Sequence, residues 1–159
     1  MNHSLFLDTP IFFQCFEKPQ LKTTLEHALN AGYNICTSIS VLGEAFTQMH
    51  EKENGMDYIF ALNGFLDDWN IAVHFPNDGV RILCFQMGED EIDTRMIREP
   101  TDRTHLAYAI AYSDNYFLTS DKNLIKYRIP SKLQDAGFSK PETMKLEEFK
   151  KVIKSNLSG

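Results

Sequence analysis

The chain has 159 residues, of which 43% are hydrophobic and 24% are charged. This composition predicts a single domain over residues 1–159 whose core needs no disulfide or structural metal, and it excludes disordered and fibrous classes. The formal net charge of −6 argues weakly against a nucleic-acid partner, because clustered Lys and Arg bind phosphates. The charge is uneven, however. Residues 1–121 carry 18 acidic and 7 basic side chains, whereas residues 122–159 carry 4 and 9.

The cysteines and the N-terminal sequence exclude further classes of protein. Cys15, Cys36 and Cys84 are odd in number and form no Cys-x-x-Cys pair, so neither a disulfide framework nor a zinc knuckle is expected. The first residues lack the basic start of a secretory signal, and no run of about 18 apolar residues predicts a membrane span. We therefore expect a cytoplasmic protein with reduced thiols and no membrane partner.

Short hydrophobic runs alternate with helical segments along the chain. In order, the first half predicts a strand at 4–7, a turn at 8–10, a helix at about 19–30 that ends at Ala31-Gly32, an extended segment at 34–37, a helix capped by Ser38 or Ser40, and a helix at about 55–69. The second half predicts a turn at 76–79, a strand at 80–85, a helix at 88–99, a helix at 101–112, strands at 116–119 and 143–145, and a basic helix at about 146–155. This alternation predicts a three-layer α/β/α fold around a parallel sheet of four to five strands.

Two acidic residues stand where predicted strands end. Asp8 follows the hydrophobic run 5–7, and Asp121 follows the run 116–118 with two residues between. Each would lie at the carboxyl edge of a parallel sheet, where α/β proteins carry their chemistry. Asp is also common in turns and before helices, where it caps backbone N–H groups, and this alternative stays open for each residue alone.

Two more acids lie on predicted helices beside the core. Asp102 shares one helical stripe with Leu106 and Ile110, which places its carboxylate along the buried side. A first-turn acid that complements the helix dipole explains its position near the helix start but not this alignment. Glu44 lies about 60° around its helix from Val41, on the rim of the core-facing stripe, and taken alone it is more simply a solvated residue.

A cluster of these four acids would need positive charge. Two carboxylates about 4 Å apart repel each other by roughly 4 kcal/mol at an effective dielectric constant of 20. Such a cluster is stable only with a cation or with bound protons. All-oxygen ligation of this kind suits Mg²⁺ or Mn²⁺.

The order and surroundings of the four acids resemble the PIN domain of metal-dependent ribonucleases, including VapC-type toxins. The resemblance rests on the segments FLDTP, TSISVLGEAF, DRTHLAYAIA and FLTSDKNL and covers nearly the whole chain. It implies a PIN-like fold and a catalytic, metal-binding quartet with a short hydroxyl residue before its last member: Asp8, Glu44, Asp102 and Asp121, with Thr119. One or two Mg²⁺ or Mn²⁺ ions would lower the pKa of a bound water and neutralise charge on the scissile phosphate.

The resemblance also assigns roles and shows two departures. The three aspartates are expected as direct metal ligands, and Glu44 as the residue that holds a metal-bound water or acts as general base. Pro10 stands where the family often has Asn or Ser. Asn123 stands where many members have a further acid, and it can bond a metal-bound water without adding charge. The number of metal ions is therefore left open.

Basic side chains near the acids are the candidates for RNA contacts, with ordinary solvated charge as the alternative: Arg98, Arg103, Lys122 and Lys126. The basic tail begins directly after Asp121. Four of the negative charges belong to the quartet, which leaves −2 of the −6 for the rest of the chain. Net acidity is therefore poor evidence against RNA, and we expect RNA binding to depend on the metal.

Three other residues are given structural interpretations. His105 follows Asp102 by three residues and is expected on the helix surface. Cys36 and Cys84, in predicted strands, are expected in the core. Some of the many aromatic residues are expected at the surface, where they would serve dimerisation or a partner's helix.

The resemblance implies a metal-dependent endoribonuclease and, within that class, the toxin of a type II toxin-antitoxin pair. An antitoxin would cover the acidic site with a basic or hydrophobic segment, and a homodimer is expected on resemblance alone. Two alternatives stay open: a housekeeping RNA-processing PIN nuclease and a catalytically silent PIN-like interaction module. A phosphoryl-transfer domain with a nucleophilic Asp is disfavoured, because Pro10 stands where dehalogenase-like enzymes need a second acid.

Overall fold

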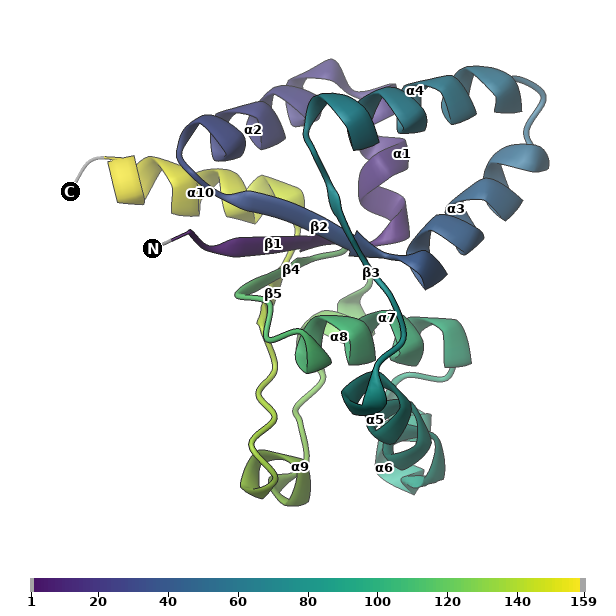
Figure 1. Cartoon of the computed structure of the whole chain (residues 1–159), viewed down its shortest axis with the longest axis vertical. Helices are drawn as coiled ribbons and strands as arrows, with labels where there is room; N and C mark the ends of the chain where they lie inside the picture. The colour runs from purple at the N-terminus through teal and green to yellow at the C-terminus, as the bar shows by residue number, and fades with distance from the viewer. Residues whose placement is uncertain (1, 158–159) are drawn as a thin grey trace.

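Five parallel strands form the centre of the computed structural model, which describes residues 2–157 (Figure 1). The strands are β1 (Ser4–Leu7), β2 (Asn34–Ser38), β3 (Ala72–His74), β4 (Tyr116–Leu118) and β5 (Glu142–Met144). They lie in the order β3-β2-β1-β4-β5, and each neighbouring pair is parallel. The predicted α/β fold with a parallel sheet is therefore confirmed, with five strands.

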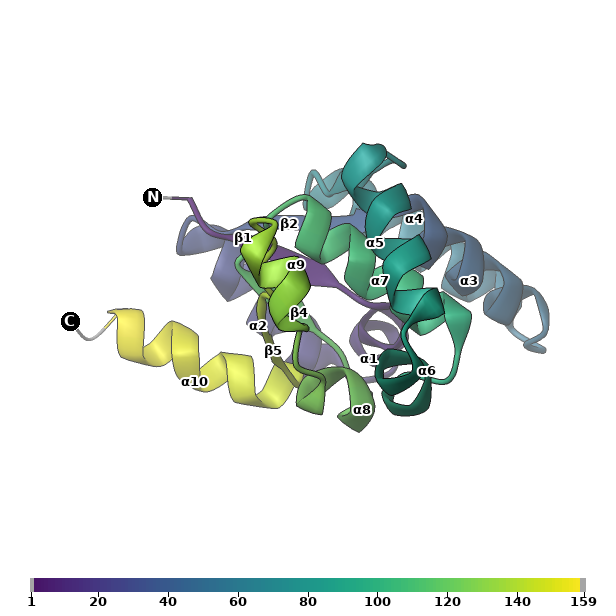
Figure 2. The same cartoon turned by 90° about the horizontal axis from the view of Figure 1, so that it is seen from below.

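Helices cover both faces of the sheet. One layer holds α1 (Thr9–Glu17), α2 (Pro19–Asn30), α3 (Ile39–His50), α4 (Gly55–Asp68) and α10 (Leu146–Leu157). The other layer, nearest the viewer in Figure 2, holds α5 (Asp78–Glu89), α6 (Glu91–Met96), α7 (Pro100–Ala111), α8 (Lys122–Lys126) and α9 (Ser131–Asp135). Crossovers between parallel strands are right-handed. The connections that lead from β1 to β3 and those that lead from β4 to β5 run in opposite directions across the sheet, so their helices lie on opposite faces. Within residues 2–157 no helix is both long and apolar enough to span a membrane.

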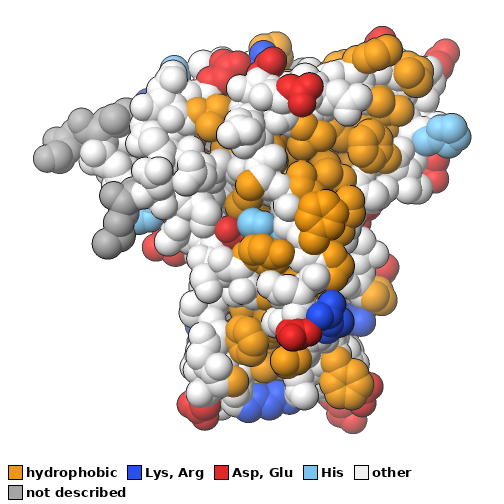
Figure 3. Space-filling model, viewed as in Figure 1, with side chains coloured by type: hydrophobic (Ala, Val, Ile, Leu, Met, Phe, Trp, Pro, Cys, Tyr) orange, Lys and Arg blue, Asp and Glu red, His pale blue; other side chains and the backbone are white. Residues whose placement is uncertain are grey.

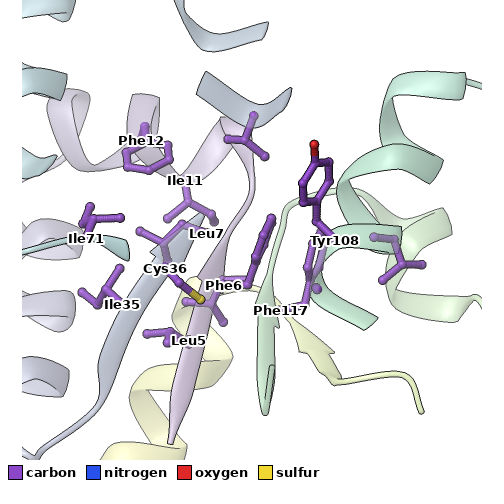
Figure 4. Packing of buried hydrophobic residues seen from close by; sticks show 14 of the residues in the cluster. Leu5, Phe6, Leu7, Ile11, Phe12, Ile35, Cys36, Ile71, Tyr108 and Phe117 are labelled. Atoms are coloured by element: carbon purple, nitrogen blue, oxygen red, sulfur yellow. The ribbon is translucent and has the colours of Figure 1, made fainter. Parts of the chain in front are cut away.

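The core lies on both sides of β1 and β4. Residues 5–7 of β1 are fully buried, and the Phe6 ring stacks on that of Phe117 in β4 with centroids 5.1 Å apart (Figure 4). A strand covered on both faces is hydrophobic throughout rather than alternating, which explains the continuous apolar run at this position. These two central strands therefore form a rigid base for the loops at their carboxyl ends.

The predicted strand at 80–85 is wrong, because this segment belongs to α5. Asn77 caps the helix by accepting a 2.9 Å hydrogen bond from the N–H of Val80. Three side chains at helical spacing are buried: Val80, Leu83 and Met87. Ile82 and Phe85, in contrast, are 51% and 65% exposed. A short apolar run does not distinguish a strand from one face of a helix, so tertiary packing decided the outcome.

Several boundaries also differ from the expectation. The turn expected at 8–10 is the start of α1, with Asp8 as N-cap and Pro10 in the first turn, where its missing N–H is not needed. The helix expected at 88–99 is divided between the end of α5 and α6. The edge strand β3, with three residues, was not predicted. Cys84 lies half-buried in α5 rather than in a strand.

The expected helix boundaries around β2 are confirmed. Ser38, rather than Ser40, caps α3 by accepting a 3.2 Å bond from the N–H of Val41. Gly32 has a φ of +87°, which glycine tolerates and which ends α2 at the predicted point. These two caps fix where α3 begins.

A tight turn joins α3 to α4 and sets how these helices pack. A Cβ added at Gly55, the first residue of α4, would collide with the carbonyl oxygen of Met49 in α3, whereas one at Gly64 would meet nothing within 4 Å. We expect Gly55→Ala to lower the free energy of unfolding by roughly 1–3 kcal/mol, as overpacking does. Gly64→Ala, the control in the same helix, should raise it by roughly 0.5–1 kcal/mol. Urea unfolding of both variants tests this, and equal effects would contradict it.

Candidate active site

The carboxyl ends of β1 and β4 lie side by side at the point where the order of strand addition reverses. The chain builds from β1 outward to β3, then returns to add β4 on the other side of β1. The connections leave β1 and β4 toward opposite faces of the sheet, and in sheets of this topology the crevice at this edge is the usual ligand site. Asp8 follows β1, and Thr119 and Asp121 follow β4, so the topology brings these three residues to one place.

Asp8 is held by three hydrogen bonds at this edge. Its Oδ1 accepts from the backbone N–H of Thr9 and from Nδ1 of His105, each at 2.9 Å. Its Oδ2 accepts from the hydroxyl of Thr119 at 2.7 Å. The carboxylate is 3% exposed, and these bonds satisfy the requirement that a buried polar group be paired.

Thr119 connects Asp8 to Asp121. While its hydroxyl donates to Asp8, the same oxygen accepts a 3.1 Å bond from the N–H of Asp121. Asp121 in turn caps α8, because its Oδ1 accepts from the N–H groups of Asn123 at 2.7 Å and Leu124 at 3.3 Å. Both aspartates are thus helix N-caps and also lie in the crevice. Helix capping is therefore confirmed for both residues, and their functional role stays a prediction.

Asp102 lies within the electrostatic field of the other three acids. It is half-buried in the first turn of α7, and the residues on its stripe, Leu106 and Ile110, are fully buried as expected. Burial, and then the negative charges of the other three acids, raise the pKa of Asp102 to about 6, although His105 opposes this. The four acids are therefore brought together, and their charges are not fully compensated.

His105 lies inside this cluster, and its expected place on the helix surface is wrong. The side chain is fully buried, with Nδ1 bonded to Asp8 and Nε2 3.7 Å from Oε2 of Glu44. Burial lowers the pKa of His105, but the hydrogen bond to Asp8 and the charges of three acids outweigh it and raise the pKa overall. A helical residue three positions after Asp102 shares its face, and this was the available sequence signal.

Glu44 completes the cluster from α3. Its Oε1 accepts a 3.1 Å bond from Nε2 of Gln48, and its Oε2 faces His105. Ligand atoms of Glu44, Asp102 and His105 lie within 4.8 Å of one another. A cleft of about 600 Å³ adjoins them, with four acids in its lining: Glu44, Glu51, Glu99 and Asp102.

The donor set fits a hard divalent cation. Carboxylate oxygens suit Mg²⁺ and Mn²⁺, and the raised pKa of Asp102 indicates negative charge that a cation would compensate. In addition, His105 Nε2 is buried and has no hydrogen-bond partner among residues 2–157. The described residues therefore leave part of the negative charge of the cluster uncompensated and one buried nitrogen without a hydrogen bond.

The basic candidates differ in how available they are. Arg98, Lys122 and Lys126 are exposed, and the two lysines begin and end α8 directly after Asp121. Arg103, in contrast, is half-buried, and its Nη1 donates to the carbonyl oxygens of Ile97 at 2.6 Å and Arg98 at 3.0 Å. Arg103 therefore fixes the turn between α6 and α7, which makes it a weaker candidate for RNA than sequence position suggested.

The fold of this chain is similar to that of solved VapBC and VapC structures. The chain superposes on the VapBC2 structure from Rickettsia felis bound to a promoter DNA fragment with a TM-score of 0.67 at 13% identity, covering 89% of this chain and 98% of that one. It superposes on DNA-bound VapBC from Salmonella typhimurium with a TM-score of 0.65 at 16% identity, covering 92% and 99%. For VapC20 of Mycobacterium tuberculosis, a Sarcin-Ricin loop cleaving toxin, the values are 0.52, 14%, 85% and 96%.

No protein-family model matches the sequence, and no curated protein is significantly similar to it. The likeness therefore lies in the fold, which is that of the VapC PIN-domain toxins over nearly the full length of both chains. The resemblance noted in the sequence is confirmed at this level.

The raised pKa of Asp102 gives a stability prediction. Because the folded protein holds this proton up to about pH 6 and the unfolded chain releases it near pH 3.8, stability falls as the pH rises through this range. In EDTA at pH 7.5 we expect Asp102→Asn to melt at a higher temperature than the wild type, with the difference disappearing near pH 3.5. Mg²⁺ should stabilise the wild type more than the variant.

The matched control is Asp135→Asn, which removes the same charge from an exposed position. It should leave both the pH dependence and the response to Mg²⁺ unchanged in thermal denaturation. A melting temperature of Asp102→Asn at or below that of the wild type at pH 7.5 in EDTA would contradict the account.

Proposed function

We propose that this chain is a metal-dependent endoribonuclease that cleaves RNA phosphodiester bonds, with residues 1–159 as one PIN-like domain. The observation that carries the proposal is that the acidic quartet, Thr119 and His105 come together at the carboxyl ends of β1 and β4, where the strand order reverses. The hydrogen bonds from Thr119 and His105 to Asp8 and the raised pKa of Asp102 make this a connected group rather than four separate surface acids.

Asp8, Asp102 and Asp121 would hold one or two Mg²⁺ or Mn²⁺ ions, with Glu44 beside them. When bound, such a cation neutralises charge on a scissile phosphate and activates water as the nucleophile. Glu44, on its longer side chain and less buried than Asp8, would hold a metal-bound water or act as general base. Asn123 can orient a water from the exposed side of the crevice.

The chain's own residues position the ligands. Thr119 fixes Oδ2 of Asp8, and His105 fixes Oδ1, so the carboxylate cannot rotate. His105 is also the positive charge nearest to Asp8 and Glu44 when it is protonated, which reduces their repulsion in the absence of a cation. It is therefore a positioning residue for the cluster.

The partner proposal is that this enzyme is the toxin of a type II toxin-antitoxin pair. The structures from R. felis and S. typhimurium are VapBC complexes bound to DNA. On this chain a band of hydrophobic side chains crosses the surface from α4 past β3 to α5 (Figure 3). The elements that the band crosses carry exposed aromatic side chains: Phe60 in α4 is 67% exposed, Phe75 directly after β3 is 58% exposed, and Phe85 in α5 is 65% exposed. Exposed apolar area of this kind supports a protein partner, either an antitoxin or a second copy in a homodimer.

RNA is the proposed substrate, and a cytoplasmic location follows from it. Phosphates approaching the crevice would meet Lys122 and Lys126 on one side and the acids on the other. Because like charges repel, RNA binding should need the cation that cancels the charge of the quartet.

The decisive experiment measures cleavage of single-stranded and structured RNA by the purified protein with Mg²⁺, Mn²⁺ or EDTA. We expect cleavage only with a divalent cation, and a rate at least about 100-fold lower for Asp8→Asn and Asp102→Asn, since loss of one charge-stabilising group costs that much. Asp135→Asn should cleave as the wild type does. Cleavage that persists in EDTA or in Asp102→Asn would contradict the proposal.

Expression in a bacterial host separates the possible roles. Growth arrest that is lost in Asp8→Asn supports the toxin. Cleavage without growth arrest supports a housekeeping RNA-processing nuclease, and binding of a partner without cleavage supports a catalytically silent interaction module.

The positioning role of His105 has a test of its own. His105→Asn keeps an N–H donor close to the place of Nδ1, whereas His105→Leu removes it. We expect the Leu variant to bind Mn²⁺ more weakly and to cleave more slowly, with Asn restoring part of both. Equal loss in the two variants, measured by calorimetry and by the cleavage rate, would show that the hydrogen bond to Asp8 is not what matters.

A further inference from the structure

A second cluster of metal-ligating side chains shares no residue with the acidic crevice. It consists of Cys36 in β2, His74 at the end of β3 and Asp114, which follows α7. One ligand atom from each lies within 4.8 Å of the other two. The three residues are far apart in the sequence. Strands β2 and β3 are neighbours in the sheet, which brings Cys36 and His74 near each other, and Asp114 lies in the turn between α7 and β4.

The carboxylate of Asp114 is the centre of this cluster. Its Oδ1 accepts a 3.3 Å hydrogen bond from the thiol of Cys36, and its Oδ2 accepts a 2.9 Å bond from Nε2 of His74. Burial, and then the charge of Asp114, raise the pKa of the Cys36 thiol well above its usual range. The three potential metal-ligand groups therefore face one another.

The surrounding residues hold these side chains in place. The His74 ring stacks on that of Tyr112, with centroids 3.8 Å apart and an angle of 8° between the planes. The Tyr112 hydroxyl donates a 2.7 Å bond to the carbonyl oxygen of Phe75, next to His74 in the chain. Figure 4 shows the Cys36 sulfur beside Phe6, in the packed core. Rigid ligands of this kind lose little freedom when they bind an ion.

The charge of Asp114 is buried with little compensation. Asp114 is 6% exposed, and among residues 2–157 its ion pair is with His74, whose side chain is itself only 12% exposed. Buried charges in proteins are normally paired or coordinate metals, because desolvation is costly. A neutral thiol and one histidine provide weaker compensation than a divalent cation does.

The donor types select the metal. Thiolate, imidazole and carboxylate together suit Zn²⁺, whereas Mg²⁺ and Mn²⁺ prefer oxygen ligands. Bonds of about 2.3 Å to sulfur and about 2.0–2.2 Å to nitrogen and oxygen, at tetrahedral angles, place donor atoms roughly 3.2–3.6 Å apart. Sγ of Cys36 and Oδ1 of Asp114 are 3.3 Å apart, which lies within this range, and the ligand atoms of all three residues lie within 4.8 Å of one another.

We propose that Cys36, His74 and Asp114 bind one Zn²⁺ ion at a site separate from the acidic crevice. On binding, the Cys36 thiol loses its proton to solvent, and the sulfur forms the bond to zinc in place of its hydrogen bond. A water completes the four ligands from the side where His74 reaches the surface.

Zinc at this site would join three separate segments. It would tie the edge strand β3, which has only three residues, to β2 and to the turn before β4. Since an ion that binds only the folded state stabilises it by mass action, zinc should strengthen the edge of the sheet.

The test uses the full chain without a histidine tag, with Zn²⁺ and its spectroscopic substitute Co²⁺ as the probes. We expect one equivalent of Co²⁺ to give the intense near-ultraviolet absorption of a thiolate ligand, and Zn²⁺ to displace it. Cys36→Ser should abolish this absorption. His74→Gln should weaken Zn²⁺ binding by more than about tenfold, since even the outer partners of zinc ligands cost about 10–100-fold when lost. Zn²⁺ should also raise the melting temperature of the wild type but not that of His74→Gln.

Two controls distinguish this site from others on the chain. Cys84→Ser removes a different cysteine and should keep the thiolate absorption. Asp102→Asn disables the other candidate metal cluster, which contains no sulfur, and should keep it as well. The proposal is overturned by a Co²⁺ complex without thiolate absorption, by absorption that persists in Cys36→Ser or is lost in either control, or by unchanged Zn²⁺ affinity in His74→Gln. If Cys36→Ser does not fold, the half-buried His74→Gln variant decides.

Discussion

The acidic site depends on the hydrogen bonds that the buried carboxylate of Asp8 accepts. This carboxylate is buried where β1 ends, and its hydrogen bonds join three separate parts of the chain: the start of α1, Thr119 after β4 and His105 in α7. Because both oxygens are occupied by these donors, the position of Asp8 also fixes the positions of its partners. A buried carboxylate without them would be costly, so the loop after β4 and the helix α7 are constrained to approach this edge of the sheet.

The same arrangement brings four acidic side chains together, and the neighbouring residues compensate only part of their negative charge. Burial, and then the negative charges of Asp8, Asp121 and Glu44, raise the pKa of Asp102 to about 6. A buried histidine compensates part of this charge, and its Nε2 remains without a hydrogen-bond partner among the described residues. A divalent cation bound there would reduce the repulsion between these carboxylates, because opposite charges compensate each other at short distance.

The two clusters differ in chemistry as well as in place. The acidic crevice offers mostly hard oxygen ligands at the carboxyl edge of the sheet, whereas the second cluster combines Cys36, His74 and Asp114. Their donor types favour different cations, so occupation of one does not imply occupation of the other. The hydrophobic band that crosses the surface from α4 past β3 to α5 is a separate feature, and it is the candidate surface for a protein partner.

The sequence by itself determined the fold class, because continuous apolar runs such as 5–7 occur where a strand is covered on both faces. It also indicated the acids, since Asp8 and Asp121 follow strands and Asp102 shares a stripe with Leu106 and Ile110. Only the tertiary structure decided that 80–85 is helical, that His105 is buried against Asp8, and that Asp114 meets Cys36 and His74. The physical reason is the same in each case. Local periodicity reports which residues share a face, but which distant segment covers that face depends on the order of the strands.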